Sequence, residues 1–578
     1  MQDSSGHRPV SLESHNSQMQ KQRLKQAHQS MRNGDRNPDA YIKAARYCKQ
    51  LGQLHETLEI LRQGIARCAP SESLHEYYIE RLEKCNRTEA AIEAARQAAT
   101  LFPDQVIFRL REALTLPILY DTQQQIDSYR RRFAEGLQRI IREVPLETPG
   151  QRESALSAIG RSSNKYLPYQ GQNDRDLQVM YGGWVQRVME ANYPQRSAPD
   201  PMPPVDGKIR VGYLTAFSGR FLNLSAAKLF GGWIRELDRE QFEVFAYHAD
   251  RADGPSEEVL RWNIPFRQFS GNVGEIAATV RADRLHVLIY LDFGIHPRMA
   301  QLAALRLAPI QCVAWDTPLT SGMPAMDYFL SSDLMEPDDG QEHYSEELIR
   351  LPGVGVSFIK PVIPAVLFTK VRRDFGLRDN AVVYLCCQSI FKYSPAQDDV
   401  VVRIARQVPE AEFVFLTTNE LAGNDLRARM ERAFAAADLS ANESCVFLGE
   451  MDLLDYWNLH QVGDVCLDTL GWSGGVTTFE AIACGLPVVT LPGRLMRARH
   501  SSAILRQLGV METVASDTAH YVDIAVRLGL DRKWRKTVLD RMAAGYQRLY
   551  SDTRSIRSLE EFVRGITNKR FDRSNTPG

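Results

Sequence analysis

The chain has 578 residues, of which 44% are hydrophobic and 24% charged, and its formal net charge is -1. This length exceeds what one hydrophobic core supports and predicts roughly three or four domains. The near-zero net charge excludes an overall electrostatic field that would draw nucleic acid or an anionic membrane to the protein. No apolar run approaches the roughly 18 residues of a membrane span, so we expect neither nucleic acid nor a membrane as a partner.

Nine cysteines are scattered along the chain without a Cys-x-x-Cys pair. An odd number without regular spacing favours reduced thiols over a disulfide framework. The first 30 residues are rich in Gln, Ser, His and Lys and contain no apolar core of a signal peptide. These features predict a cytoplasmic protein.

Residues 1–34 contain few large apolar residues and are predicted to form a disordered tail. A helical pattern follows over 35–145, where Pro70 and Pro103 lie 33 residues apart. This spacing is close to the tetratricopeptide period of about 34 residues, in which a proline ends each helix pair. The alternative is an ordinary pair of helical hairpins. A further helix over 122–143 would cap the array.

A helical linker is expected over 146–205, and it ends in a Pro-rich segment. Beyond it, short apolar runs alternate with helical segments and indicate parallel sheets buried on both faces. The runs lie at 209–213, 242–247, 287–291, 382–385, 413–416, 445–448, 465–467 and 487–491. They predict an α/β architecture of two Rossmann-like lobes, at 206–360 and 361–566, followed by a flexible tail at 567–578. Ligands of such folds bind at the carboxyl ends of the strands, so we expect a site between the lobes.

The stretch 464–480 carries the most information about chemistry. It predicts a strand, a turn containing Gly475, and a helix that starts near Thr477. Free backbone N–H groups at the helix start, together with the hydroxyls of Thr477 and Thr478, favour a pyrophosphate group. Glu480, one turn later, is placed to accept hydrogen bonds from a ribose. Taken alone, the stretch is equally typical of a tight turn with threonine caps.

Residues 480–493 follow with a Gly-Leu-Pro-Val-Val-Thr-Leu-Pro-Gly strand, which resembles the nucleotide-sugar half of two-lobed (GT-B) glycosyltransferases. With the Asp-Val-Cys-Leu-Asp-Thr run at 464–469, the threonine pair and the segment 523–528, the chain resembles the O-GlcNAc transferase/SPINDLY family. The glutamate at position 480 resembles the SPINDLY branch of the family, because the animal enzymes have Asp at this position. The resemblance covers about residues 35–565.

Two upstream blocks also resemble the family. The segment 388–395 includes Gln388 and a lysine that contacts the donor diphosphate in the family. The resemblance therefore implies that Lys392 stabilises the leaving nucleotide diphosphate, whereas the alternative is a solvated surface lysine. The segments 308–311, 320–328 and 344–352 resemble a first-lobe loop and return strand, and they place Thr320, Ser321 and Gly322 on the acceptor side.

Two further residues match the family by position. Tyr456 would stack on the nucleobase, or else belong to the core. Arg499 would reach the diphosphate, or else pair with a surface carboxylate.

The chain departs from the family where a proton acceptor is expected. Leu224 occupies the usual position of a first-lobe histidine, and leucine cannot move a proton. Val476 replaces the histidine that precedes the threonine pair in animal enzymes, as in SPINDLY-type members. The remaining candidates are Asp283, which matches a first-lobe aspartate of the family, and His296 in the loop after 291–292. Alternatively, Asp283 caps an element end and His296 is a solvated loop residue.

No metal-binding constellation stands out, since Asp250 and Asp253 lack the Asp-x-Asp spacing and 337–339 is a predicted surface loop. We expect no metal and no cofactor, with a UDP- or GDP-linked sugar as the donor substrate. The resemblance implies an inverting transfer of GlcNAc, fucose or glucose to a Ser/Thr hydroxyl of a protein held by the repeats. One rival hypothesis is a non-catalytic repeat scaffold with a degenerate transferase fold. Another is transfer to a lipid or polysaccharide.

Overall fold

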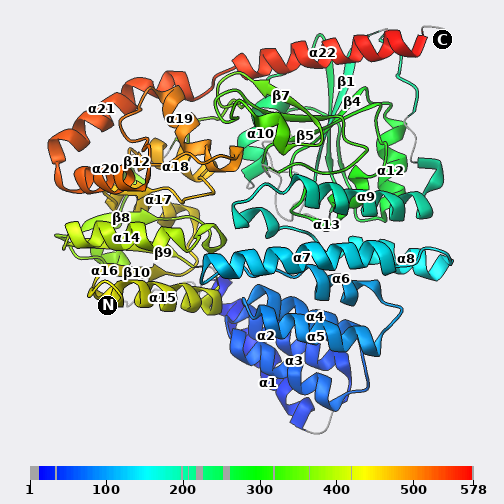
Figure 1. The fold of residues 1–578 in the computed structure, drawn as a ribbon, viewed down its shortest axis with the longest axis horizontal. Helices are drawn as coiled ribbons and strands as arrows, with labels where there is room; N and C mark the ends of the chain where they lie inside the picture. The colour runs from blue at the N-terminus through cyan, green and yellow to red at the C-terminus, as the bar shows by residue number, and fades with distance from the viewer. Residues whose placement is uncertain are drawn as a thin grey trace, which may run out of the picture.

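The computed structural model contains an all-α arm followed by two parallel-sheet lobes, so the predicted fold class is confirmed (Figure 1). It describes residues 12–32, 36–196, 200–205, 207–216, 225–250, 261–316, 319–362, 365–417 and 419–575. Within these ranges, none of the helices has both the length and the apolar character that crossing a membrane requires.

The arm contains two helical hairpins of matching size. They consist of α2 (Pro38–Gln50), α3 (Leu54–Arg67), α4 (Glu72–Lys84) and α5 (Thr88–Leu101). Each boundary of the second hairpin lies 34 residues after its counterpart in the first. A Cβ at Gly64 would lie 2.8 Å from Cγ of Tyr41, so this glycine lets α3 approach α2 closely. The structure thus has the predicted tetratricopeptide-like period.

A helical bridge connects the arm to the lobes. It contains α6 (Val106–Leu114), α7 (Gln123–Glu143), α8 (Pro149–Ile159), η1 (Leu167–Gln170), α9 (Arg175–Asn192) and η2 (Pro194–Arg196). The predicted capping helix is α7, whose first turn is capped by the Thr122 side chain accepting from Gln125 N. In Figure 1, α7 lies between the arm and the lobes.

Both predicted tails are partly wrong. Residues 12–32 form α1 (Leu12–Arg32), which packs on α2 and buries Leu24. Residues 567–575 continue α22 (Arg554–Asn575), in which Thr567 is fully buried. Both segments are polar overall, and each is ordered by an apolar surface built elsewhere in the chain, which composition alone does not show.

The first lobe holds a seven-stranded sheet in the order β3-β2-β1-β4-β5-β6-β7, with every pair parallel. Its strands are β1 (Ile209–Thr215), β2 (Phe242–His248), β3 (Phe266–Gln268), β4 (Val287–Tyr290), β5 (Ile310–Ala314), β6 (Tyr328–Ser332) and β7 (Glu347–Leu351). The helices described in this lobe include α10 (Ser225–Arg235), α12 (Val273–Ala282) and α13 (Pro297–Ala303).

The second lobe holds a five-stranded parallel sheet in the order β10-β9-β8-β11-β12. Its strands are β8 (Val382–Cys386), β9 (Ala411–Leu416), β10 (Cys445–Leu448), β11 (Val465–Leu467) and β12 (Val488–Val489). Its helices are α14 (Ala396–Gln407), α15 (Glu420–Ala435), α16 (Ala441–Ser444), α17 (Leu453–Val462), α18 (Val476–Ala483), α19 (His500–Leu508), α20 (Thr518–Leu530) and α21 (Arg532–Leu549). The short helix η6 (Ile390–Lys392) follows β8.

Several contacts hold the lobes against each other, including one made by α22 and one at the cleft. Helix α22 runs back across the first lobe, where Phe562 packs edge-on against Tyr328 (Figure 1). At the cleft, Lys228 of α10 forms an ion pair with Glu480 of α18, with Nζ 2.6 Å from Oε1. One interlobe space is lined by residues that follow β4 and β5 of the first sheet and β8 and β11 of the second.

Candidate active site

Asp468, directly after β11, builds the turn that precedes α18. Its buried carboxylate accepts hydrogen bonds from Ser473 Oγ at 2.6 Å, Gly474 N at 2.8 Å and Thr490 Oγ1 at 2.7 Å. Three donors from two segments hold the turn in one shape, and the first N–H groups of α18 lack partners within the helix. A helix start of this kind, with free N–H groups, can accept an anion.

A chain of hydrogen bonds connects Lys392 to this turn. Lys392 Nζ donates to Gln388 Oε1 at 2.8 Å, and Gln388 Nε2 donates to Thr477 Oγ1 at 2.8 Å. A Cβ on Gly474 would lie 2.6 Å from Gln388 Nε2, so only glycine fits beneath this chain. Both lysine and helix start are therefore fixed relative to each other.

These groups line an interlobe cavity of about 410 Å³. Gln388, Lys392, Gly475 and Thr477 come from the second lobe, and Asp292 and Asp316 face them from the first. Burial lowers the pKa of Lys392 to about 8. The nearby carboxylates of Asp468 and Asp316 act in the opposite direction and raise it. An anion in the cavity would favour the charged ammonium form.

Two predicted donor residues turn away from this cavity. Thr478 is buried, with its Oγ1 3.0 Å from Gly474 O and 2.7 Å from Ser501 Oγ. Glu480 is occupied by its ion pair with Lys228. Thr478 therefore stabilises the turn, and Glu480 would have to exchange its partner to contact a ribose.

Tyr456 and Arg499 also lie outside the wall of the cavity. Tyr456 packs against His460 on α17, with ring centroids 4.2 Å apart, as the core alternative predicts. The Arg499 guanidinium donates to the carbonyl of Gly493 at 3.1 Å. The structure thus does not bring either side chain to the place expected for the nucleotide diphosphate.

The acceptor-side loop is anchored by Glu346. Its carboxylate accepts from Thr320 Oγ1 at 2.6 Å and from Ser321 N at 2.7 Å. Gly322 has φ +65°, and a Cβ there would lie 2.1 Å from Gln178 O of α9, so glycine is required for this packing. Of the three predicted residues, Ser321 lines a second cavity.

This second cavity, of about 280 Å³, adjoins the first and has aromatic walls. Its aromatic residues are Tyr169, Tyr181, Phe293, Phe391 and Trp472. Tyr169 stacks on Trp472 with ring centroids 4.0 Å apart, and both residues also line the first cavity. Asp316 is another residue common to both walls.

The predicted catalytic role of Asp283 is not supported by its position. Asp283 caps the end of α12, accepts from Tyr247 OH at 2.8 Å and pairs with Arg267, at 2.9 Å from Nε. It lines neither cavity. The physical reason is topological: Asp283 precedes β4 and lies at its amino end, whereas ligands of parallel sheets bind at the carboxyl ends.

His296 does line the aromatic cavity. Its side chain caps α13 by accepting from Arg298 N at 3.2 Å, and its Nε2 lies 3.3 Å from Asp250. Burial lowers the pKa of His296, whereas the Asp250 carboxylate acts to raise it. Leu224, at the position of the family histidine, lies outside the described residues.

Sequence reasoning missed Asp316. It stands two residues after β5, and only the start of that strand lies within the family-like segment 308–311. Burial and the neighbouring carboxylate of Asp292 raise the pKa of Asp316 to about 8, whereas the ammonium group of Lys392 acts to lower it. The rule that polar residues after parallel strands face the ligand would have found it, had β5 been recognised.

A large part of the chain matches the model of a known protein family. Residues 185–359 and 360–558 match the model of glycosyl transferase family 41. The chain belongs to this family. The two matched segments cover the two lobes.

Among its family 41 relatives, the chain is 25% identical over 373 residues to the probable UDP-N-acetylglucosamine–peptide N-acetylglucosaminyltransferase SPINDLY of Arabidopsis thaliana. That match covers 61% of this chain and 39% of the relative. It is also 25% identical over 333 residues to the A. thaliana protein SEC of the same description, covering 56% of this chain and 33% of SEC. The chain thus spans less than half the length of these curated relatives.

A solved structure shares the fold over nearly the whole length. A mutant of the O-GlcNAc transferase of Thermobaculum terrenum superposes with a TM-score of 0.67 at 21% identity. The match covers 97% of this chain and 99% of the other. The helical arm and both lobes therefore recur together in that bacterial protein.

Proposed function

We propose that this family 41 glycosyltransferase moves a sugar from a nucleotide diphosphate sugar to a Ser or Thr hydroxyl of a protein, with inversion and without a metal ion. The observation that carries the proposal is the hydrogen-bonded chain from Lys392 through Gln388 to Thr477, set at the start of α18 inside the interlobe cavity. This arrangement suits a diphosphate group.

In the proposed reaction, the acceptor hydroxyl attacks the anomeric carbon while the bond from that carbon to the β-phosphate oxygen breaks. Negative charge then builds on the diphosphate. The Lys392 ammonium and the N–H groups before Thr477 neutralise that charge, and they are already oriented when the bond breaks. Because these groups supply the positive charge, the leaving group needs no metal ion.

UDP-GlcNAc is the first donor to test, because the names of the plant relatives describe transfer from it. GDP-fucose and UDP-glucose are the other candidates. Glu480 lies one turn into the helix that would hold the diphosphate, so a ribose that reaches it would release Lys228 from the interlobe ion pair.

A protein acceptor is supported by a groove between the arm and the second lobe. This groove, of about 1,100 Å³, is lined by Lys49, Glu80 and Arg81 of the arm and by Asn419 and Arg427 near α15. It reaches Gln388 and Phe391 at the edge of the two interlobe cavities. A polypeptide lying in this groove would approach the cleft directly.

The test measures nucleoside diphosphate release and sugar incorporation into a Ser/Thr peptide library, with each of the three donors and with excess chelator. We expect one donor to support transfer, unchanged by chelator and lost in Lys392→Ala. Donor binding without transfer for all three donors would favour the scaffold function instead. Chelator-sensitive transfer would contradict the metal-independent mechanism.

A further inference from the structure

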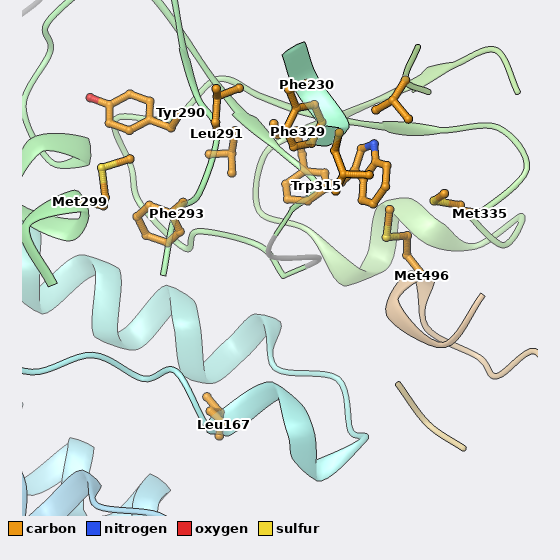
Figure 2. Packing of buried hydrophobic residues seen from close by; sticks show 14 of the residues in the cluster. Leu167, Phe230, Tyr290, Leu291, Phe293, Met299, Trp315, Phe329, Met335 and Met496 are labelled. Atoms are coloured by element: carbon orange, nitrogen blue, oxygen red, sulfur yellow. The ribbon is translucent and has the colours of Figure 1, made fainter. Parts of the chain in front are cut away.

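Asp316 occupies a fixed place at the junction of the two interlobe cavities. It follows Trp315, which is buried at the end of β5 and packs edge-on against Phe230, with ring centroids 5.6 Å apart (Figure 2). On its other side, the Trp315 ring lies 5.1 Å from that of His500 in the second lobe. The backbone that carries Asp316 is thus held by the cores of both lobes.

The Asp316 carboxylate is available for a substrate. No described residue donates a hydrogen bond to it, although it is only partly exposed. By contrast, the Asp292 carboxylate after β4 accepts from Thr215 Oγ1 at 2.5 Å and from Ala216 N at 3.2 Å. A carboxylate that lacks a protein donor in a largely enclosed site is expected to bind a donor from the ligand.

The charged and titratable groups around Asp316 come from every side of the junction. In the cavity of about 410 Å³, Lys392 and His500 face it from the second lobe, and Asp292 lies on its own side. His296 and Lys165 line the aromatic cavity. Burial and Lys392 lower the pKa of His500 to about 3, so His500 is neutral at physiological pH.

The aromatic cavity shares Asp316 with the first cavity and gives an acceptor a way to reach this junction. Its walls of Tyr169, Tyr181, Phe293 and Phe391 suit an apolar or aromatic group with few charges. The same cavity also has polar groups on its wall, including Lys165, His296, Ser321 and Asp316. A residue that carries a hydroxyl could therefore place its carbon atoms against the rings and its oxygen at Asp316.

We propose that Asp316 is the proton acceptor for the acceptor hydroxyl, which enters through the aromatic cavity; this inference rests on the function proposed above. The hydroxyl oxygen forms the new bond to the anomeric carbon and gives its proton to the Asp316 carboxylate. The electron pair of the broken bond leaves on the nucleoside diphosphate, beside Lys392. The proton then passes from Asp316 to solvent as the products depart.

The first test compares Asp316→Asn with wild type and with Asp338→Asn, the same change at an exposed first-lobe aspartate. We expect Asp316→Asn to lower transfer from UDP-GlcNAc, or from whichever of the three donors the wild type uses, to the peptide library by about 10²–10⁴-fold. Its affinity for the matching nucleoside diphosphate, measured by calorimetry, should stay within about threefold of wild type. Asp338→Asn should match wild type in both measurements.

The pH profile of kcat/KM separates a proton acceptor from a structural residue. The pKa of Asp316 is raised to about 8, so wild-type kcat/KM should rise with pH toward 8 as the carboxylate ionises. The pKa of Lys392 is lowered to about 8, so activity should fall above it. In Asp316→Asn the rise should vanish while the fall remains.

An acceptor peptide with Cys in place of its Ser sharpens the test, because a thiol ionises without help at pH 9. The defect of Asp316→Asn should shrink at least tenfold with this thiol acceptor. If wild type transfers sugar but Asp316→Asn stays within about threefold of it with an unchanged pH profile, the role of Asp316 is overturned and the proposed function stands. If wild type transfers from none of the donors, both fail.

Discussion

On the second-lobe side of the cleft, Asp468 accepts three hydrogen bonds and Gln388 joins Lys392 to Thr477. On the first-lobe side, Asp316 receives no hydrogen bond from the described residues. The second-lobe wall is a hydrogen-bonded network, whereas the first-lobe wall presents a carboxylate that has no donor among the described residues. The difference fits the substrates, because a diphosphate has one shape for every donor, whereas protein acceptors vary.

On the second-lobe wall of the cleft, we expect the largest effect when its cation is removed. Lys392→Ala should lower kcat by about 10²–10³-fold, the usual loss when one group that stabilises developing charge is removed. Steady-state transfer assays measure this effect, with Lys536→Ala at an exposed position as the control. A loss below about fivefold would show that another group carries the charge.

Gly474→Ala should damage the same wall through sterics. The added Cβ would lie 2.6 Å from both Gln388 Nε2 and Thr478 Oγ1, so the turn must shift. We expect UDP binding to weaken by about 1–3 kcal/mol, measured by calorimetry. Gly565→Ala, where a Cβ meets nothing within 4 Å, is the matched control and should leave binding unchanged.

The two neighbouring threonines should separate binding from stability. Thr477 lines the cavity, whereas Thr478 is buried with partners in the protein. Thr478→Val should lower the free energy of unfolding by about 1–3 kcal/mol, because it leaves buried partners unpaired. Thr477→Val should lower UDP affinity with a smaller change in Tm. Equal effects from both variants would contradict the assignment of their positions.

The smallest expected effect is the pH dependence of stability that comes from Asp316 on the first-lobe wall. The folded-state pKa of Asp316 is raised to about 8, so folding favours the protonated acid. The stability that this preference adds is complete below the ordinary aspartate value and is lost as pH rises through about 8. Asp316→Asn should therefore have a higher Tm than wild type at pH 7.5 and an equal Tm near pH 4. A lower Tm at pH 7.5 would show that ionised Asp316 stabilises the fold.

The second-lobe wall of the cleft could be predicted from the sequence, because most of its residues lie close together along the chain. Gly475 and Thr477 are neighbours in one turn, and Gln388 and Lys392 are four residues apart after a recognisable strand. Thr478 differs because helix geometry rotates consecutive residues to different faces, and only the packing against Ser501 shows which face is buried.

The acceptor wall could not be predicted in the same way. Asp283 and Asp316 are both aspartates next to strands, and their roles depend on which end of the sheet each occupies. Arg499 and Tyr456 match family positions, yet neither side chain lines the cavity. Such distinctions depend on long-range packing, and the spacing of residues along the chain does not reveal that packing.

The amino-acid sequence by itself determined the architecture and the location of the turn and helix start for which we propose diphosphate binding, because hydrophobic periodicity, glycine placement and helix starts are local properties. Tertiary structure alone decided which aspartate lines the interlobe cavities, how Glu480 is paired and that polar segments such as α1 become helical. Each of these outcomes requires surfaces from distant parts of the chain, and the free energy that selects them exists only after those surfaces meet.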